Sequence, residues 1–516
     1  MTVDAIESPA AVTGRPGRRV SWTTLAGAIP VALTVWVYWP LTRSWFQADD
    51  VVNMASIVNE GFLRFALRPF GGHNLLIRNT VFYASWRLLG LHAAPYFWTV
   101  LLTHLLNVWL LFRLLHRLTS SATLGCFGAT LWGASPIVAG TLNWYSVFGQ
   151  VLVGTILLVV LGQLAELSRA GTPVSGRTAW TWYALLLLGT LCFGVGLGIA
   201  LSFPVALFVM LPAAWHQPRV RAGYLALPVV TVVVYLAFRH LYPLLFEPLS
   251  AAELASRPGG IRDLPAVFDA VSRLLGFAMS EYPRGFFWAA GAYPDRASWI
   301  VLALAGAGIA VLSWRGSPAA RRAVIGLTSL SLGVYLTIAL GRTWFLAPPK
   351  LAMQARYHYV AGIPIIAVLC LVLQEVGRSG PLRHVPRVPL LLAALALFGW
   401  GRTCSRYRVD LNAGPRIAVE SGLRTIAAKV RLVPPGETAY LENGTNGRAL
   451  LGAVMPNSDF PGRAAIFLIT HDDDQLDGRT VRFIERDPAI LARYGRRPES
   501  RLARLLVAPG SVPPGR

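Results

Sequence analysis

A succession of long apolar runs constrains the fold of this 516-residue chain more than any other feature. A helix needs ~20 apolar residues to cross a bilayer, and about eleven runs approach that length. They are too many and too long for one buried core, so we expect an all-α polytopic membrane protein. The runs lie near residues 21–41, 95–113, 122–142, 145–166, 178–195, 198–214, 222–242, 298–313, 323–342, 358–376 and 388–403.

The composition supports this class and argues against nucleic-acid binding. Hydrophobic residues make up 54% of the chain and charged residues only 14%, with a mean hydropathy of +0.51. A soluble chain carries roughly a quarter charged residues. The net charge of +22 comes mostly from arginines in short loops beside apolar runs, where they orient helices. No basic stripe with interleaved aromatic residues is present, so we expect no nucleic-acid partner.

The basic loops predict the topology. Arg15, Arg18 and Arg19 precede the first run, which places residues 1–20 in the cytoplasm as a tail. We then expect a transmembrane domain over 21–403 and an extracytoplasmic domain over 404–516, in a plasma membrane of the bacterial inner-membrane type. The basic loops that fall on the cytoplasmic side in this count lie at 116–117, 169–177, 219–221, 315–322 and 378–387.

Three segments differ from the spans. The apolar stretches 77–91 and 264–280 are interrupted by charges, so we expect helices that lie at the membrane interface, the first of them in the first outer loop. The polar, Gly- and Pro-rich segment 404–516 predicts a small α/β domain. Its expected elements are a helix at 416–431 and strands at 438–441, 465–470 and 480–484.

Asp49 and Asp50 are the leading candidates for chemistry. They lie a few residues beyond the first run, at the predicted outer face of the membrane, and no basic residue lies within 47–62 to pair with them. Two adjacent carboxylates should raise the pKa of one of them, which suits a general base. They could equally hold a divalent cation, although no cofactor is certain, or simply end the span.

Basic residues are expected mainly in the cytoplasmic loops, and the arginines that depart from this rule form a second candidate set at the outer face. A guanidinium is a planar fork of donors that matches phosphate oxygens, so the set suggests a lipid phosphate. Each of them alone could equally be a snorkelling surface residue. The set is Arg64, Arg68, Arg78, Arg239, Arg284, Arg342 and Arg356, of which we expect Arg68, Arg239, Arg342 and Arg356 to bind the phosphate.

Polar and aromatic residues near these arginines are candidates to line a substrate. An aromatic ring at this level is typical of the membrane interface, and it can also stack on a sugar. In the second run His104 and Asn107 lie one helical turn apart, and there we expect a helix–helix hydrogen bond. The expected substrate-lining residues are His73, Asn143, Trp144, Tyr357 and His358.

Several short motifs, in their order along the chain, resemble the GT-C superfamily of membrane glycosyltransferases. The similarity is strongest to the branch with protein O-mannosyltransferases and TMTC-like proteins, and it covers most of residues 20–375. The motifs are Ala48-Asp49-Asp50, Arg68-Pro69-Phe70, residues 101–107 with His104 and Asn107, Ser135-Pro136 leading to Asn143-Trp144, and residues 355–359.

The resemblance implies a sugar donor linked to polyprenyl phosphate and an acceptor hydroxyl on a protein, lipid or glycan. It also implies that Asp49 or Asp50 is the catalytic base and that Arg356 binds the donor phosphate. Two departures stand out: residues 193–198 lack a Lys-Glu pair, and Gln150 stands near the place of an expected aspartate. A lipid transporter and a non-catalytic glycolipid-binding relative therefore stay open as alternatives.

Overall fold

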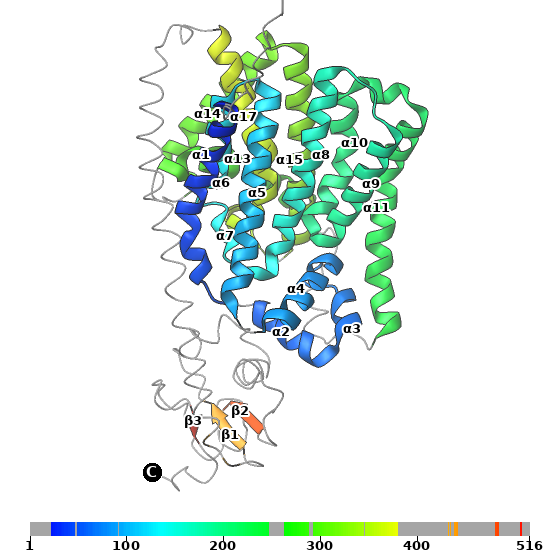
Figure 1. The fold of residues 1–516 in the computed structure, drawn as a ribbon, viewed down its shortest axis with the longest axis vertical. Helices are drawn as coiled ribbons and strands as arrows, with labels where there is room; N and C mark the ends of the chain where they lie inside the picture. The colour runs from blue at the N-terminus through cyan, green and yellow to red at the C-terminus, as the bar shows by residue number, and fades with distance from the viewer. Residues whose placement is uncertain are drawn as a thin grey trace, which may run out of the picture.

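The structure is a computed structural model that describes residues 22–46, 49–90, 92–246, 263–287, 293–344 and 346–379, and a few residues beyond them. The long helices form an elongated bundle, in which successive helices mostly alternate in direction (Figure 1). The first part of the bundle consists of α1 (Trp22–Tyr38), η1 (Trp39–Arg43), α2 (Asp49–Glu60), α3 (Phe62–Leu67), α4 (Leu76–Leu89), α5 (Ala93–Thr119), α6 (Ala122–Gly133), α7 (Ala139–Leu142), η2 (Tyr145–Val147) and α8 (Phe148–Ala170).

The second part of the bundle packs α10 against α15 and α17 against α5, α6, α8 and α15. Its elements are α9 (Gly176–Cys192), α10 (Gly194–Met210), η3 (Pro212–His216), α11 (Pro218–Leu245), α13 (Leu264–Phe287), α14 (Arg296–Arg315), α15 (Pro318–Arg342), α16 (Pro348–Ala352), η4 (Ala355–Tyr357) and α17 (Tyr359–Ser379).

Six of the described helical segments are long and apolar enough to cross a membrane. They agree with six of the expected spans: Ala93–Thr119, Tyr145–Ala170, Pro218–Leu245, Arg296–Arg315, Pro318–Arg342 and Tyr359–Arg378. Expected spans 21–41, 178–195 and 198–214 correspond to the 17-residue helices α1, α9 and α10. The expected span 388–403 lies outside the described residues.

The expected span 122–142 is not one helix. It divides into α6, which ends at Gly133, and the four-residue α7. Pro136 lies between the two and has no N–H to continue a helix, and it disfavours the helical conformation at Ser135. The carbonyl of Ser135 accepts a hydrogen bond from the Tyr38 hydroxyl at 2.6 Å, which ties this break to α1.

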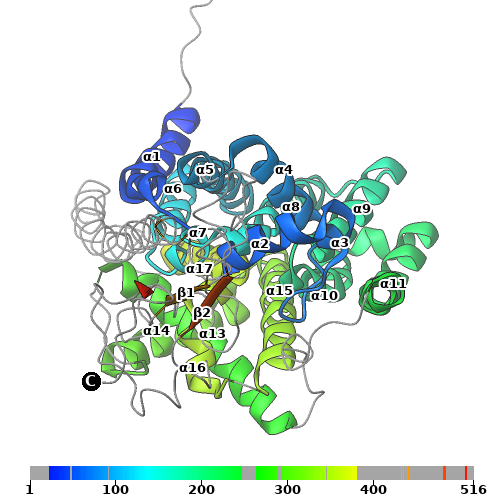
Figure 2. The same ribbon diagram turned by 90° about the horizontal axis from the view of Figure 1, so that it is seen from below.

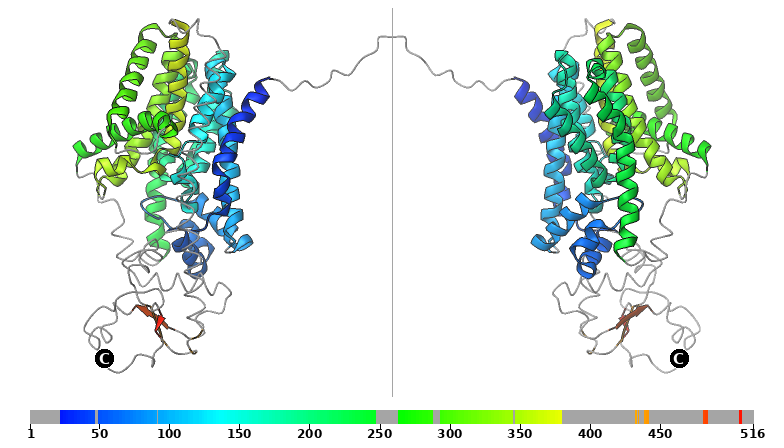
Figure 3. Two further views of the ribbon diagram at one scale, coloured as in Figure 1. Left: turned by 90° about the vertical axis from the view of Figure 1, so that its left-hand side faces the viewer. Right: turned by 90° about the vertical axis from the view of Figure 1, so that its right-hand side faces the viewer.

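The short helices α2, α3 and α4 gather at one end of the bundle, the lower end in Figure 1 and in both views of Figure 3. Viewed from below, α2 lies near the middle of that end (Figure 2). Helices α5 and α8 run from this end of the bundle towards the opposite end (Figure 1), and the last turn of each is basic, with Arg117 in α5 and Arg169 in α8. This separation agrees with the predicted topology, in which the acidic pair and the basic loops lie on different sides.

The helix expected at 264–280 is α13, which has 24 residues and does not meet the criteria for a membrane span. One face buries Val267, Ala270 and Leu274, while Asp269 and Arg273 form a partly exposed ion pair at 2.9 Å. This is the amphipathic pattern that the sequence predicted. α4 corresponds to the helix expected at 77–91.

Three short strands are described in the C-terminal part of the chain, and they form one sheet in the order β2-β1-β3. β1 (Thr438–Leu441) pairs in parallel with β2 (Thr480–Phe483) and antiparallel with β3 (Leu506–Val507). The first two agree with strands expected at 438–441 and 480–484. The expected helix at 416–431 and the strand at 465–470 lie outside the described residues.

A buried polar network joins four helices around the middle of α5. His104 Nε2 donates to the carbonyl of Gly133 at 2.9 Å, so Nδ1 is free to accept from the Tyr359 hydroxyl at 2.8 Å. Asn107 donates to the Tyr359 hydroxyl at 3.1 Å and to the carbonyl of Val151 at 2.9 Å. The expected helix–helix hydrogen bond is confirmed, and it fixes the first residue of α17.

Small residues bring α10 and α15 close together. A Cβ on Gly198 would collide with the carbonyl of Gly333, and a Cβ on Gly333 would collide with Ser202. Such close backbone contact through small residues is the usual way in which helices associate in a membrane. Gly306 in α14 offers a contrast, because nothing lies within 4 Å of the place where its Cβ would be.

We predict that Gly198→Ala lowers the free energy of unfolding by about 1–3 kcal/mol, because the added methyl group meets backbone that cannot move aside. Gly306→Ala is the matched control, and it should be neutral or stabilising, because alanine favours a helix over glycine. Thermal unfolding of both variants in detergent measures this difference. Equal melting temperatures would contradict the packing described here.

Candidate functional site

Asp50 connects α2 to the start of α8. Its side chain is fully buried, and Oδ1 accepts hydrogen bonds from the backbone N–H and the hydroxyl of Ser146, both at 2.6 Å. Ser146 lies in η2, directly before α8, where backbone N–H groups have no helical partner and favour a negative charge. One of the two adjacent carboxylates is therefore held by the protein itself.

Asp49 is the more available carboxylate. It is the first residue of α2 and is half-buried, and no hydrogen bond or ion pair is formed by its carboxylate among the described residues. Burial raises its pKa above the usual value of 3.8, while the nearby Arg78, Arg356 and Arg342 act in the opposite direction. The sequence predicted that repulsion between the two aspartates would raise one pKa, whereas in the structure burial raises the pKa of Asp49.

Arg78 of α4 is the basic partner that the local sequence did not reveal. It is buried, and its Nη1 donates to Oδ1 of Asn53 at 2.8 Å; Asn53 in turn donates to the Ser146 hydroxyl at 3.0 Å. Burial lowers the pKa of Arg78 to about 10, while Asp49 and Asp50 raise it. The guanidinium therefore remains charged at neutral pH.

His73 lies beside these groups on a tight turn. Gly71 and Gly72 both have positive φ angles, of 56° and 82°, and the backbones of Phe70 and His73 pair across the turn. His73 Nε2 accepts a hydrogen bond from Nη2 of Arg342, at the end of α15, over 2.7 Å. Burial lowers the pKa of His73 well below 6.5, and neighbouring arginines lower it further, so the imidazole is neutral.

Arg356 approaches from the other side of the site, on η4. Its guanidinium lies 5.2 Å from the centre of the Trp144 ring and 5.0 Å from that of Tyr357. Gly140 allows this approach, because a Cβ there would meet the backbone N of Arg356 at 3.0 Å. Among the described residues, no hydrogen bond or ion pair is formed by the Arg356 side chain. Its donors are therefore available to an anion.

These groups form what we call the polar cluster. Three guanidinium groups face two carboxylates and a neutral imidazole, which leaves a net positive charge. Carboxylates and guanidinium groups therefore lie side by side at the end of the bundle that carries α2–α4. The polar cluster consists of Asp49, Asp50, His73, Arg78, Arg342 and Arg356.

Other predicted site residues lie outside the polar cluster. Arg68 donates to the hydroxyl of Ser56 at 2.6 Å, and Ser56 lies about two helical turns after Asp49 in α2. Arg239 has no described contact with the cluster. His358 is fully buried; its Nε2 donates to the carbonyl of Ala352 and its Nδ1 accepts from the hydroxyl of Tyr335. The ring thus has a structural role.

The remaining predicted lining residues are contiguous with the cluster. Asn143 ends α7, Trp144 follows it, and Tyr357 lies beside Arg356. Sequence reasoning missed Ser146 and Asn53, because a serine and an asparagine without a motif give no signal of their partners. It noted Gln150 only as a departure from a family pattern.

The described residues contain no group of three or more His, Cys, Asp or Glu side chains that could hold a metal ion. Asp49 and Asp50 are the nearest approach to such a site, and Oδ1 of Asp50 already accepts two hydrogen bonds from Ser146. A divalent cation at this pair would therefore need further oxygen ligands from the substrate or from water.

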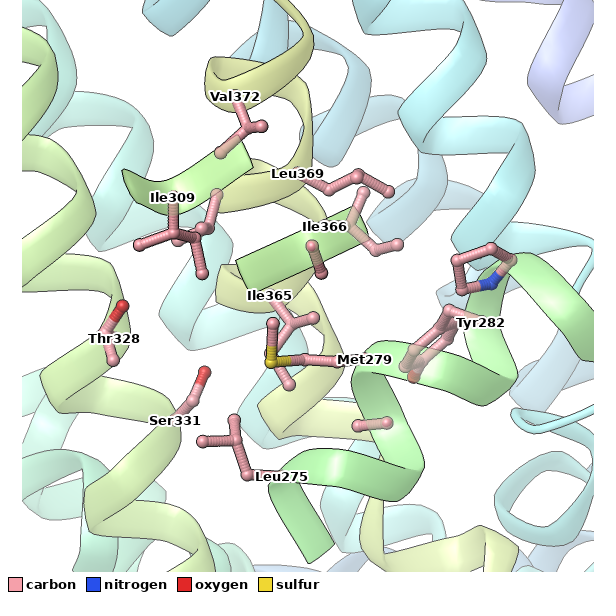
Figure 4. A pocket seen from close by; sticks show the side chains of 14 residues that line it. Leu275, Met279, Tyr282, Ile309, Thr328, Ser331, Ile365, Ile366, Leu369 and Val372 are labelled. Carbon is pink, nitrogen blue, oxygen red and sulfur yellow. The ribbon is translucent and has the colours of Figure 1, made fainter. Parts of the chain in front are cut away.

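A separate apolar pocket lies between α13, α14, α15 and α17 (Figure 4). Its volume is about 110 Å³, and its few polar groups are the hydroxyls of Thr328, Ser331 and Tyr282. None of the predicted site residues lines it. The Tyr282 hydroxyl donates to the carbonyl of His358, and Ser331 donates to that of Ala361. Among the described residues, no Asp, Glu, His, Lys or Arg lines the pocket, and its tyrosine hydroxyl is already bonded to the backbone, so we place the candidate chemistry in the polar cluster.

Comparison with known proteins supports the fold. No family model and no curated protein sequence matches the chain. Among solved structures, the chain is similar to ArnT from Cupriavidus metallidurans bound to undecaprenyl phosphate, with a TM-score of 0.50 and 14% sequence identity over 92% of each chain. This likeness shows that the chain shares the overall fold of ArnT over most of its length.

We predict that Ser146→Ala lowers the free energy of unfolding by about 1.5–3 kcal/mol, because it removes a short hydrogen bond to a buried carboxylate. Ser329→Ala is the matched control, since that hydroxyl donates only to Gly326 within its own helix. Thermal unfolding in detergent measures both variants. If Ser146→Ala were no less stable than Ser329→Ala, Asp50 would not have the anchoring role described above.

Proposed function

We propose that this chain is a GT-C-type glycosyltransferase that moves a sugar from a polyprenyl-phosphate donor to a hydroxyl acceptor. The observation that carries the proposal is the position of Asp49, a carboxylate without a hydrogen-bond partner among the described residues, near the guanidinium groups of Arg342 and Arg356. The ArnT-like fold supports the same class of reaction. The acceptor belongs to a protein, a lipid or a glycan.

In this proposal Asp49 is the general base. It takes the proton of the acceptor hydroxyl as that oxygen attacks the anomeric carbon of the donor. The bond between this carbon and the phosphate oxygen breaks, and the polyprenyl phosphate leaves with the electron pair. A carboxylate whose pKa is raised by burial accepts a proton more readily than an ordinary aspartate, and the nearby guanidinium groups favour its ionised form.

Arg356 and Arg342 bind the donor phosphate and stabilise the charge that develops on it as it leaves. Both guanidinium groups are already in place: Arg356 on the rings of Trp144 and Tyr357, and Arg342 on the neutral imidazole of His73. This preorganisation means that little reorganisation is needed during the reaction. Asp50 acts through position, because it holds α2, and with it Asp49, against α8.

The alternative of a lipid transporter has less support. A transporter is expected to carry charged side chains near the middle of its membrane-spanning helices. The network described there, formed by His104, Asn107 and Tyr359, is a set of uncharged groups whose hydrogen bonds are satisfied by neighbouring helices. The charged groups of the polar cluster lie instead on short helices, turns and helix ends.

We predict that Asp49→Asn reduces sugar transfer by about 10²–10⁴-fold, the usual contribution of a general base. The assay uses membranes from cells that express the full chain, with radiolabelled polyprenyl-phosphate mannose and glucose as donors. Asp269→Asn is the control, because it makes the same chemical change in the partly exposed pair of α13. Transfer by Asp49→Asn at the rate of the unmodified protein would refute the assignment of the base.

The pH dependence of transfer gives a second prediction. Because Asp49 must be ionised to accept a proton, activity should be lost as the pH falls through its pKa, which burial raises above 3.8. His73 should add no inflection near 6.5, because its pKa lies well below that value. A pH–rate profile of donor-saturated membranes measures both features. An inflection at 6.5 that disappears in His73→Asn would contradict this assignment.

A further inference from the structure

Gln150 is a buried amide without a hydrogen-bond partner. It lies in the first turn of α8, its side chain is 1% exposed, and neither Oε1 nor Nε2 has a partner among the described residues. Leaving a buried polar group unpaired costs about 1–3 kcal/mol, and native proteins pair nearly all such groups. An amide with both ends unpaired therefore indicates a group that is absent when the protein is alone.

The position of Gln150 places it beside the polar cluster. Ser146, about one helical turn before it, bonds to Asp50, and Gly154, one turn after it, faces the ring of Tyr359. Residues one turn apart share a helix face, so Gln150 lies between the anchor of α2 and the first residue of α17. Its neighbour Gly149 packs against Phe193, whose ring lies tilted against the His73 ring with the centroids 4.6 Å apart.

A second unpaired donor lies nearby, on Trp144. Its indole Nε1 is buried and has no hydrogen-bond partner among the described residues, while the ring of Trp144 faces the Arg356 guanidinium. Two unpaired polar groups on the segment 144–150 thus accompany an arginine with available donors. Trp144 and Gln150 flank the start of α8, and Trp144 contacts Arg356, so one ligand with several polar atoms could meet all three.

The chemistry of these groups identifies the part of the ligand that they bind. A glutamine amide is neutral and offers donors and an acceptor together, and an indole N–H only donates. Hydroxyl groups, which both donate and accept, match this set, whereas a phosphate is better matched by the guanidinium groups. The Trp144 ring can also pack on the apolar face of a sugar.

We infer that Gln150, together with the indole N–H of Trp144, binds the hydroxyl groups of the donor sugar, next to the phosphate at Arg356. This inference rests on the proposed function and deepens it, because it separates sugar recognition from phosphate recognition within one site. A glutamine that merely stabilised the fold would be paired with protein atoms, as Gln374 is with the carbonyl of Thr119 at 2.8 Å.

The test measures binding of two lipids to the purified full chain in detergent: undecaprenyl phosphate without a sugar, and the same lipid carrying mannose or glucose. The variants are Gln150→Met, which keeps the length of the side chain without its polar atoms, Arg356→Ala, and Gln374→Met as the matched control. The quantity compared is the dissociation constant of undecaprenyl phosphate divided by that of the sugar-bearing lipid. This ratio isolates the contribution of the sugar to binding.

We expect Gln150→Met to reduce this ratio about tenfold or more, while its affinity for undecaprenyl phosphate stays unchanged. Arg356→Ala should weaken both lipids by a similar factor, and Gln374→Met should change neither. Gln150→Met should also melt at or above the temperature of the unmodified protein, because it removes unpaired buried atoms, whereas Gln374→Met loses a hydrogen bond and should melt lower.

An unchanged ratio in Gln150→Met, together with weaker binding of both lipids by Arg356→Ala, would overturn the inference and leave the proposed function intact. A lower melting temperature of Gln150→Met with an unchanged ratio would assign the amide a structural role and also overturn the inference. If the unmodified protein binds neither lipid, the proposed function fails, and the inference fails with it.

Discussion

The structure of the candidate site depends on the hydrogen bonds between Asp50 and Ser146. A buried carboxylate is costly unless it is satisfied, and here a backbone N–H and a hydroxyl at the start of a long apolar helix supply two bonds of 2.6 Å. These bonds, together with the burial of Met54 and Ile57 in the core, fix the short helix α2 to the end of the bundle. Asp49, its first residue, is positioned as a consequence.

The balance of charge around Asp49 follows from this anchor. Arg78, Arg342 and Arg356 reach the same place from α4, α15 and η4, and each is held by a different partner: Asn53, His73 and the Trp144 ring. The neutral imidazole accepts a hydrogen bond where a carboxylate would cancel charge. The cluster therefore keeps a net positive charge, which suits the proposed anionic donor, and it retains one carboxylate that suits the proposed base.

The apolar runs were enough to predict a polytopic helical membrane protein, because span length and backbone satisfaction leave few options. The acidic pair was also identifiable. Its environment was not, because Arg78 and Ser146 come from elements that only tertiary packing brings together. Likewise, His358 was expected to line the substrate from its neighbours in sequence, whereas its two ring nitrogens are bonded to Tyr335 and Ala352.

The central claim, that the polar cluster receives the phosphate of a polyprenyl donor, is tested most directly by an experimental structure of the full chain with undecaprenyl phosphate. Our account predicts phosphate oxygens within hydrogen-bonding distance of the Arg356 and Arg342 guanidinium groups, with Asp49 facing the space beside them. A phosphate bound at Arg239 or Arg68, or at the opposite, basic end of the bundle, with the cluster unoccupied, would contradict it.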